Sequence, residues 1–372
     1  MSPPGEGGEG GEAVAALNAG SSSIKFALFS ADAAPEEIMR GQIEHVTHAD
    51  GDALLRELES HLDGRRLVAI GHRIVHGGSR FVAPVRLTPE IIAALRDLTP
   101  LAPLHQPLGL APIEAVATAR PRLTQIACFD TAFHHDLRPP ASRYAIPRAF
   151  EAKGIRRYGF HGLSYEYIAR RLKETSAPGR KVVVAHLGSG ASLCAMLDGR
   201  SIDTTMGFSA LDGLVMATRP GAIDPGILLY LLKQEGFTPD RLEQFLYHEC
   251  GLLGVSGLSA DMRDLLGSDD PRAAEAIDLF AFSISRHIAE MANSLGGLDV
   301  LVFSGGIGEH APVLRAMVAA RLGWLGAVLD EAANRAAAPR ISAAGSRIEL
   351  RIIPTDEELI IAEHTVAALG RS

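Results

Sequence analysis

Residues 14–28 decide the fold, and they read VAALNAGSSSIKFAL. An apolar run is broken by a short turn of asparagine, glycine and serine, after which apolar residues alternate with others. This pattern predicts a strand, a tight turn and a second strand. The turn carries hydroxyls, the Asn18 carboxamide and backbone N–H groups that Gly20 leaves open, and Lys25 follows it. Such a turn suits a phosphate, because small residues let the main chain approach an anion closely. An ordinary hairpin turn has the same composition, so both interpretations stay open here.

Length and composition exclude several classes of protein. A chain of 372 residues exceeds the size at which one hydrophobic core stops growing, so two domains are expected. The net charge of -8 comes from scattered charges of both signs, which argues against a nucleic-acid partner. No apolar run reaches membrane-spanning length and the N-terminus lacks the pattern of a signal peptide, so no membrane partner is expected. Cys128, Cys194 and Cys250 are odd in number and far apart, which favours the reducing cytoplasm over a disulfide framework. Residues 1–12 are expected to form a disordered tail.

The strand–turn–strand pattern of residues 14–28 occurs again later in the chain. Residues 181–193 read KVVVAHLGSGASL, again an apolar strand, a Gly/Ser turn and a return strand. A third glycine-rich turn ends the apolar run in VLVFSGGIGE, residues 300–309, and we expect it to be a loop before a helix at 312–322. Three such turns after apolar strands favour binding of nucleotide phosphates, although the chain has no Gly-Lys pair and therefore no Walker A motif. The repeated strand–turn–strand pattern predicts two duplicated domains with a ligand cleft between them. Paired prolines at 139–140 mark the expected boundary.

Polar residues follow two other predicted strands. The segment 71–78 reads GHRIVHGG, and its Arg73 is suited to binding an oxyanion at a strand's carboxyl end. Asp130 follows the apolar run 125–129, where a carboxylate can hold a metal ion or accept a proton, or can simply cap a helix. His161 lies among aromatic and basic residues and is either functional or structural. The HGG triplet also occurs in hydrolases, but the chain has no GxSxG nucleophile motif.

A series of motifs, taken together, resembles the acetate kinase family. They occur in the family's order and cover the chain from about Val14 to its end: NAGSSSIK (18–25), GHRIVHGG (71–78), FDTAFH (129–134), YGFHG (158–162), DTTMGF (203–208), MATR (216–219), IDP (223–225), SADMR (259–263), GGIGE (305–309) and PTDEEL (354–359). The resemblance implies an α/β protein with two duplicated ribonuclease-H-like, actin-like domains and a nucleotide cleft. It places them at 13–145 and 146–355, with a C-terminal helix at 356–372 completing the first. It also implies a homodimer.

The family's activity is reversible, Mg²⁺-dependent phosphoryl transfer between ATP and acetate, giving acetyl phosphate and ADP. By resemblance, Arg73, Asp130, His161 and Arg219 are catalytic, with Arg73 also binding the substrate. Asn18 and Glu357 help to hold Mg²⁺, with Mn²⁺ as a possible substitute. The residues implied to bind ATP are Ser21, Ser23, Lys25, His186, Leu187, Gly188, Ser189, Gly190, Asp261, Met262, Arg263, Gly306, Ile307, Gly308, Glu309 and His310.

Some residues depart from the family pattern. The pocket for the acetate methyl group maps to Val75, Leu104, Phe160 and Ala210, and the family usually has proline in place of that alanine. Loss of the proline ring is expected to enlarge the pocket, which favours propionate as an alternative substrate. Ser79, Tyr165, Ser189 and His310 also differ from the family, and Ser189 bears on the choice of phosphoryl donor.

Transfer of a phosphoryl group to a carboxylate brings two anions together, so charge neutralisation and positioning are the main requirements. Acetate is already ionised at neutral pH, and we therefore expect Asp130 to orient other groups or the metal rather than to act as a base. Two alternatives remain at this stage: a nucleotide-dependent conformational protein of the same superfamily, and a kinase that uses pyrophosphate instead of ATP. The gathering of Arg73, Arg219 and His161 favours the kinase.

Overall fold

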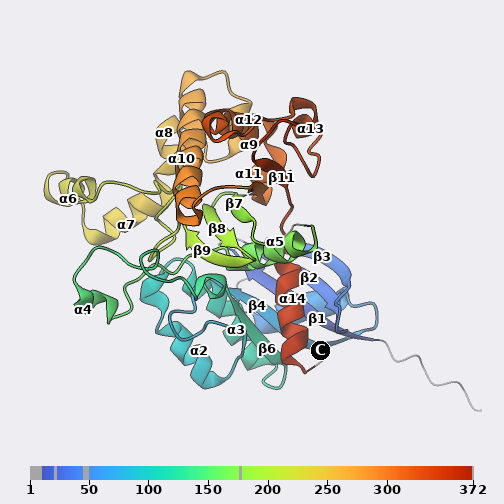
Figure 1. Ribbon diagram of the computed structural model, residues 1–372. Coiled ribbons are helices and arrows are strands. Elements are labelled where there is room, and N and C mark those ends of the chain that lie inside the picture. Colours follow the sequence, from blue (N-terminus) through green and yellow to red (C-terminus); the bar gives the residue numbers. More distant parts are fainter. Residues whose placement is uncertain (1–10, 21–22, 45–49, 176–177, 371–372) are drawn as a thin grey trace, which may run out of the picture. The chain divides into compact units, whose positions relative to one another are not determined.

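The computed structural model describes residues 11–20, 23–44, 50–175 and 178–370 (Figure 1). The chain forms two compact units: unit 1 runs to Ala132 and resumes at Asp356, and unit 2 is Phe133–Thr355. The boundary expected at 145/146 therefore lies inside unit 2, and the C-terminal segment belongs to unit 1. Strand β1 already begins at Glu12, within the expected tail, while residues 1–10 lie outside the described residues.

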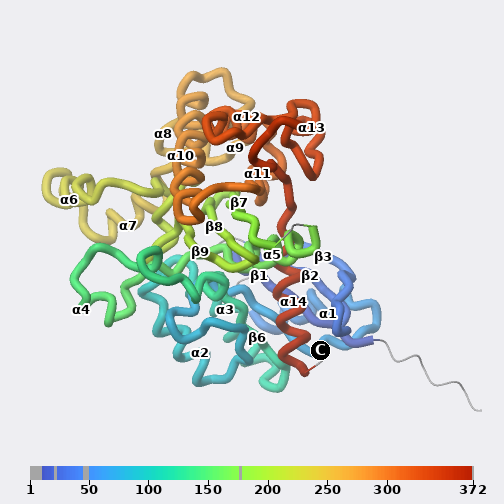
Figure 2. Tube along the Cα trace, in the orientation of Figure 1, coloured from blue at the N-terminus to red at the C-terminus, as the bar shows by residue number. Residues whose placement is uncertain are grey.

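Within the described residues, unit 1 consists of a mixed sheet and four α-helices, with one short 3₁₀ helix at Thr99–Leu101. Its strands are β1 (Glu12–Ala19), β2 (Ser23–Ser30), β3 (Glu37–Glu44), β4 (Arg66–Ile74), β5 (Val85–Arg86) and β6 (Thr124–Phe129), and its helices are α1 (Gly51–Ser60), α2 (Pro89–Arg96), α3 (Gln106–Ala119) and α14 (Glu357–Ala368). Figure 2 follows the chain as its last helix, α14, returns to the strands of unit 1.

The predicted opening hairpin is present. The strand order in unit 1 is β3-β2-β1-β4-β6-β5; β1, β2 and β3 are antiparallel, and β4 and β6 continue the sheet in parallel with β1. Asn18 stands directly opposite Lys25, so their side chains share one face of the sheet. At the turn, the Gly20 N–H donates to the Ser23 carbonyl at 2.9 Å. Ser21 lies outside the described residues.

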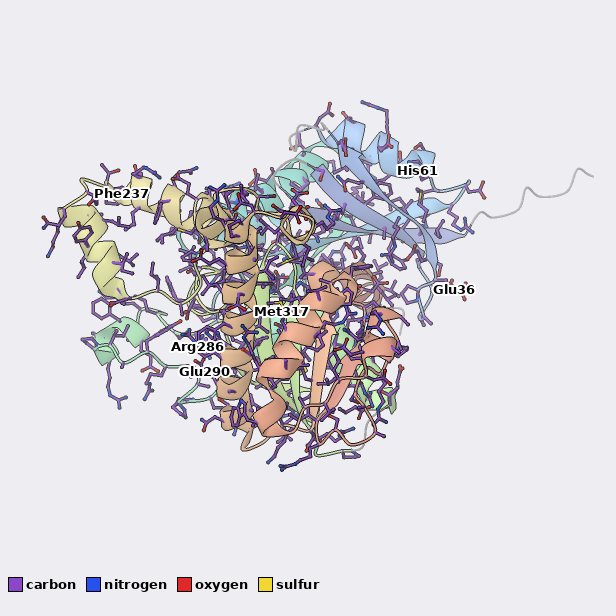
Figure 3. The ribbon with its side chains drawn as sticks, turned by 90° about the horizontal axis from the view of Figure 1, so that it is seen from above. Glu36, His61, Phe237, Arg286, Glu290 and Met317 are labelled. Atoms are coloured by element: carbon purple, nitrogen blue, oxygen red, sulfur yellow. The ribbon has the colours of Figure 1, made fainter. Side chains whose placement is uncertain are left out.

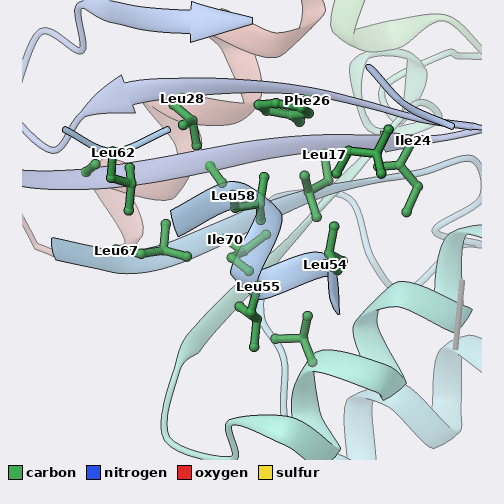
Figure 4. Close-up of a cluster of buried hydrophobic side chains, with 14 residues drawn as sticks. Leu17, Ile24, Phe26, Leu28, Leu54, Leu55, Leu58, Leu62, Leu67 and Ile70 are labelled. Atoms are coloured by element: carbon green, nitrogen blue, oxygen red, sulfur yellow. The ribbon is translucent and has the colours of Figure 1, made fainter. Parts of the chain in front are cut away.

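Helices cover both faces of this sheet. The side of β4 that carries Ile70 packs against α1 and α3, where Leu54, Leu58 and Val116 are fully buried in one apolar cluster (Figure 4). The other side meets α14 so closely at Gly71 that a Cβ there would lie 2.2 Å from the Thr365 hydroxyl oxygen. Because successive side chains of a strand alternate between faces, Arg73 projects to the same side as Gly71, toward α14.

Unit 2 contains the second sheet and the remaining α-helices. Its strands are β7 (Lys181–Leu187), β8 (Ala191–Leu197), β9 (Arg200–Thr204), β10 (Val300–Ser304) and β11 (Glu349–Ile352). Its helices are α4 (Arg148–Glu151), α5 (Gly162–Thr175), α6 (Pro225–Lys233), α7 (Pro239–His248), α8 (Gly251–Ser256), α9 (Met262–Leu266), α10 (Pro271–Leu295), α11 (Gly305–His310), α12 (Pro312–Arg321) and α13 (Glu331–Arg335), with a 3₁₀ helix at Gly323–Leu325. A further 3₁₀ turn, Ala132–His134, spans the junction of the two units. On α10, Arg286 and Glu290 lie one turn apart, and their side chains are exposed (Figure 3).

The two sheets repeat one topology. In unit 2 the order β9-β8-β7-β10-β11 matches β3-β2-β1-β4-β6 of unit 1, with an antiparallel three-stranded meander followed by two parallel strands. This confirms the duplication that the repeated strand–turn–strand pattern predicted. Unit 1 differs by the short antiparallel strand β5 at its edge. No helix in the described part of the chain is both long and apolar enough to cross a membrane.

One predicted loop is a helix. Residues 305–310 follow β10 as the short helix α11, and not as an irregular turn. Gly305 makes this possible because its φ of 74° turns the chain sharply, and a Cβ at this position would lie 2.7 Å from the Leu187 carbonyl oxygen. The backbone of α11 is further held by a buried arginine that the sequence analysis missed, which is described below.

Candidate active site

Arg73 is the centre of a polar cluster in unit 1. Its Nε and Nη2 donate to the two oxygens of Asp130, at 3.0 and 2.6 Å, and its Nη1 donates to Asn18 Oδ1 at 3.0 Å. Glu357 Oε2 lies 3.7 Å from Arg73 Nε. The cluster forms because β1, β4 and β6 are neighbours in the sheet and α14 covers the face to which Arg73 points. Four residues predicted as catalytic or metal-binding are therefore in contact.

The Asp130 carboxylate is committed to Arg73. Its side chain is 1 % exposed, and the pair of hydrogen bonds has the fork geometry that makes arginine–carboxylate contacts strong. The Asp130 backbone N–H donates to the Ile74 carbonyl at 3.0 Å, and the next residue, Thr131, accepts from the Gly77 N–H at 3.0 Å. The helix-cap interpretation of Asp130 is therefore unnecessary, because an ion pair accounts for the carboxylate.

In this cluster, two carboxylates, those of Asp130 and Glu357, face one guanidinium, that of Arg73. Burial raises the pKa of Glu357 to about 7, and the Asp130 and Glu358 carboxylates add to the rise while Arg73 and Lys25 oppose it. For Arg73, burial disfavours the charged form, but the attraction of Asp130 and Glu357 outweighs it and raises the pKa of the guanidinium above its ordinary value. Asp130 and Glu357 thus compete for one buried positive charge.

The cluster also fits the requirements of Mg²⁺. This ion usually keeps several waters and takes one or two carboxylates together with substrate phosphates, so a cage of protein ligands is not needed. Among the described residues, no group of three or more His, Cys, Asp and Glu side chains is arranged to hold a metal. Asn18 and Glu357 supply an amide oxygen and a carboxylate next to Arg73, which is the donor chemistry that a hydrated magnesium ion prefers.

In unit 2, the His161 side chain lies beside residues of strands β7 and β8. Its ring stacks on His186, with ring centres 4.4 Å apart, and its Nδ1 is 2.8 Å from Ser192 Oγ. His186 and Ser192 are directly paired across β7 and β8, so both project to the face on which His161 lies. The Phe160 carbonyl, next to His161, is bound by Nε2 of the buried His134 at 3.0 Å.

Arg219 and the β7–β8 turn meet at Gly190. A Cβ on Gly190 would lie 3.0 Å from Arg219 Nη2 and 3.3 Å from His161 Nε2, so the two predicted catalytic side chains converge beside this glycine. Arg219 Nη1 donates to the Ala210 carbonyl at 2.9 Å, and the Ala217 N–H donates to the Ser189 carbonyl at 3.1 Å. The turn, the arginine and the histidine therefore form one constellation.

The two glycine turns predicted for the nucleotide are neighbours within unit 2. Strands β7 and β10 are adjacent and parallel, with Ser304 opposite His186, so residues 186–190 and 305–310 follow the same edge of the sheet. Gly306 and His310 are exposed there. His310 Nδ1 lies 3.0 Å from the Gly306 carbonyl oxygen, and Glu309 Oε1 accepts from the Thr355 N–H at 3.3 Å.

Sequence analysis missed Arg315 on α12. This fully buried side chain donates from Nη1 to the carbonyls of Gly308 and Glu309, both at 2.8 Å, and from Nε to Asn334 Oδ1 at 2.8 Å. Burial lowers the pKa of Arg315. It satisfies the carbonyl groups at the end of α11, which have no partner within such a short helix. An arginine that binds backbone carbonyls leaves no mark in the sequence pattern.

The third predicted nucleotide segment, 261–263, begins α9. The Asp261 side chain caps that helix by accepting from the Arg263 N–H at 2.8 Å, and it forms an exposed ion pair with the Arg263 guanidinium. The hydrogen bond to Arg263 lowers the pKa of Asp261 to about 2. Met262 is buried. These contacts lie within the segment and do not join it to the two glycine turns.

The predicted substrate-pocket residues belong to different units. Val75 and Leu104 are half-buried in unit 1, whereas Phe160 and Ala210 are buried in unit 2. In unit 1, the buried Gln106 links the two segments: its Nε2 donates to the carbonyls of His76 and Leu95, both at 3.1 Å. Gln106 is a second residue missed by sequence analysis, because its partners are distant in the chain.

The buried Glu357 carboxylate generates a prediction about stability. Its pKa of about 7 in the folded chain exceeds the ordinary value of 4.5, so folding favours its protonated form and this residue costs stability as the pH rises through that window. We expect Glu357→Gln to leave stability unchanged near pH 4.5 and to increase it by about 1–3 kcal/mol at pH 8, in EDTA. Urea unfolding of unit 1 at several pH values measures this.

The matched control is Glu36→Gln, because Glu36 is an exposed glutamate of the same unit (Figure 3). Its effect on the free energy of unfolding is expected to be small at every pH. A Glu357→Gln variant that loses stability at pH 8, or whose effect does not change with pH, would contradict the proposed charge balance.

Comparison with known proteins gives a consistent result along nearly the whole chain. A model of the acetokinase family matches residues 52–363. The chain is 53 % identical to an acetate kinase of Rhodopseudomonas palustris (strain TIE-1), over 94 % of this chain and 96 % of that protein. It is 45 % identical to an acetate kinase of Rhizobium meliloti, over 96 % of this chain and 99 % of the relative.

Solved structures agree with the fold. A propionate kinase from Francisella tularensis superposes with a TM-score of 0.88 at 34 % identity, covering 95 % of this chain and 99 % of that one. An acetate kinase from Porphyromonas gingivalis gives a TM-score of 0.85 at 32 % identity, covering 96 % and 100 %. With the family model matching most of the chain and relatives this similar over their full length, the protein belongs to the acetokinase family.

Proposed function

We propose that this protein is an acetate kinase, which reversibly transfers a phosphoryl group between ATP and acetate to give acetyl phosphate and ADP. The observation that carries the proposal is the 53 % identity to a protein of that name over nearly the full length of both chains. The charges gathered around Arg73 and Arg219 support it, because the reaction joins two anions and needs cationic groups more than an activated nucleophile.

Arg73 is proposed to bind the carboxylate of the substrate. The three hydrogen bonds to Asp130 and Asn18 do not use all of its N–H donors, and its side chain is 20 % exposed. Asp130 then acts as the group that holds the guanidinium in place. This orienting role agrees with the chemistry, since an ionised carboxylate has no proton for a base to remove.

Arg219 and His161 are proposed to bind the phosphoryl group in transit. Their side chains converge beside Gly190, in the turn between β7 and β8 where Ser189 is exposed, and a turn of small residues of this kind is suited to an anion. Two cationic or hydrogen-bond-donating groups placed this way stabilise charge on the equatorial oxygens of the transferring group. The neighbouring turn at 305–310 is proposed to bind the ATP phosphates and adenosine, together with Lys25, Ser23 and the α9 segment.

Asn18 and Glu357 are proposed to hold Mg²⁺, with Mn²⁺ as a substitute. When bound, the ion neutralises charge on the nucleotide phosphates. Binding requires the Glu357 carboxylate in its ionised form, and Lys25, opposite Asn18 on β2, adds positive charge to the same face. A role in binding the ion explains why the buried Glu357 is kept next to Asp130, although its charge lowers the stability of the folded chain.

We also propose that the enzyme works in the cytoplasm as a homodimer. Helix α6 supports the second part, because Ile227, Leu229 and Tyr230 are 46 %, 52 % and 55 % exposed on a helix of nine residues with none buried. An apolar helix exposed in this way is typical of a protein interface. The three cysteines of the chain are buried and form no disulfide, which agrees with a reducing compartment.

The activity is tested by trapping acyl phosphate with hydroxylamine. Purified enzyme with ATP, Mg²⁺ and acetate is expected to give acetyl hydroxamate, and EDTA is expected to abolish the signal because the phosphates lose their counter-ion. Replacing ATP with pyrophosphate tests the alternative donor. A nucleotide-dependent conformational protein would hydrolyse or bind ATP without forming hydroxamate from any short carboxylate, and that result would refute the proposal.

Gly190 allows a test of the constellation around Arg219. In Gly190→Ala the new methyl group would lie 3.0 Å from Arg219 Nη2 and 3.3 Å from His161 Nε2 and displace both. We expect kcat to fall at least about tenfold, since transition-state contacts depend on position within fractions of an ångström. The melting temperature is expected to change little, because the displaced atoms are the ends of side chains.

Gly345→Ala is the control, because a Cβ there has no atom within 4 Å. Its kcat should equal that of the wild type. Equal activity of Gly190→Ala and Gly345→Ala would remove Arg219 and His161 from the proposed phosphoryl site.

The size of the carboxylate pocket is tested at Ala210. Restoring the family's proline with Ala210→Pro adds atoms to a buried position, and an extra methylene in such a pocket is worth about 1–3 kcal/mol. We expect the ratio of kcat/KM for propionate to that for acetate to fall about tenfold, while kcat/KM for acetate is retained. A wild-type enzyme that strongly prefers acetate, with a ratio unchanged by the substitution, would show that Ala210 does not set the chain length.

A further inference from the structure

The backbone at His161 has an unusual conformation. Its φ is 59°, in the left-handed region that residues other than glycine rarely occupy. The helix α5 starts at the next residue, and the Tyr165 N–H already donates to the His161 carbonyl at 3.1 Å. Such strain persists only where surrounding contacts hold it, and it is concentrated at functional sites. His161 is therefore held in a defined position before any ligand binds.

A chain of hydrogen bonds leads from the protein interior to the His161 ring. The Tyr165 hydroxyl on α5 lies 2.5 Å from Ser192 Oγ on β8, and Ser192 Oγ lies 2.8 Å from His161 Nδ1. Tyr165 and Ser192 are fully buried. The register explains the contact, because Ser192, Cys194 and Met196 share the face of β8 against which α5 packs.

The direction of each hydrogen bond follows from the number of protons available. A buried phenol hydroxyl has to donate its proton, and Ser192 Oγ is the acceptor within reach of Tyr165. Ser192 then has its own single proton left, which it donates to His161 Nδ1. A histidine whose Nδ1 accepts a hydrogen bond carries its proton on Nε2. Burial raises the pKa of Tyr165 well above its ordinary value, so the phenol keeps its proton.

His161 Nε2 is the atom that faces the β7–β8 turn, because it would lie 3.3 Å from a Cβ on Gly190. We propose that Tyr165, acting through Ser192, is a positioning residue that keeps His161 as a neutral Nε2–H donor aimed at this turn. The nearby Arg219 guanidinium favours the neutral form, since a second positive charge beside it is unfavourable. The proposal rests on the proposed function only for the identity of the acceptor, a transferring phosphoryl group.

The test reads the proton on His161 directly. In protein labelled with ¹⁵N-histidine, the His161 signals are assigned by their loss in His161→Gln. The wild type is expected to show an unprotonated Nδ1 and a protonated Nε2 near pH 7.5. In Tyr165→Phe, Ser192 no longer receives the phenol proton and can accept one from Nδ1. We therefore expect the Nδ1 shift to move toward the protonated value, and kcat to fall about tenfold with KM for ATP and acetate nearly unchanged.

Three further variants separate positioning from folding. Tyr167→Phe makes the same change on the same helix, outside the Tyr165–Ser192–His161 chain, and is expected to behave as wild type. Ser192→Ala removes the link and should reproduce the effect of Tyr165→Phe on kcat, whereas Ser192→Thr keeps a hydroxyl and should restore most of the activity. Thermal melting of each variant identifies any that is unfolded. If Tyr165→Phe is unfolded, the comparison of Ser192→Ala with Ser192→Thr tests the positioning role instead.

A wild-type His161 with its proton on Nδ1, or an Nδ1 shift that Tyr165→Phe and Ser192→Ala leave unchanged, would overturn the proposal. A loss of kcat without a change at Nδ1 would also overturn it, because the effect would then be structural. The spectrum needs no turnover. Failure of the proposed kinase activity in the hydroxylamine assay is therefore distinguishable from failure of this inference.

Discussion

The ion pair between Arg73 and Asp130 is the constraint on which the first unit depends. A guanidinium that is 20 % exposed at the end of β4 is balanced by a carboxylate that is 1 % exposed. Removing one partner of such a pair leaves an uncompensated buried charge, which costs about 3–5 kcal/mol. The same guanidinium donates to Asn18 in the hairpin and lies 3.7 Å from Glu357 on the C-terminal helix, so it brings both elements together at the end of β4.

The second unit has the same sheet topology as the first, but different side chains lie at the ends of its strands. Its sheet repeats the strand order of the first, and the segments proposed to bind ligands again follow the hairpin turn and the neighbouring parallel strand. In place of a cluster of opposite charges, this unit has one glycine turn, the helix α11 and a histidine in contact with the Ser192 hydroxyl. A duplicated framework thus carries a cluster of opposite charges in one copy, and an arginine and a histidine beside a glycine turn in the other.

Buried polar side chains make this framework rigid. Arg315 binds the carbonyls at the end of α11, Gln106 joins the segments that carry Val75 and Leu104, and Tyr165 reaches His161 through Ser192. Each is fully or almost fully buried, and its hydrogen bonds are with groups between 6 and 30 residues away in the chain. An unpaired polar group in such a place is costly, so each of these contacts specifies one arrangement of the loops.

The sequence by itself determined the two hairpins, their duplication and the set of motifs that identify the family, because apolar alternation and turn residues act over a few neighbouring positions. The resemblance to the family also assigned Asn18, Arg73, Asp130 and Glu357 to one site, and these four residues lie together in unit 1. Tertiary structure alone decided that Asp130 pairs with Arg73, that residues 305–310 form α11, and that Tyr165 reaches His161. These features depend on contacts between residues far apart in the chain, and local sequence patterns carry no record of such contacts.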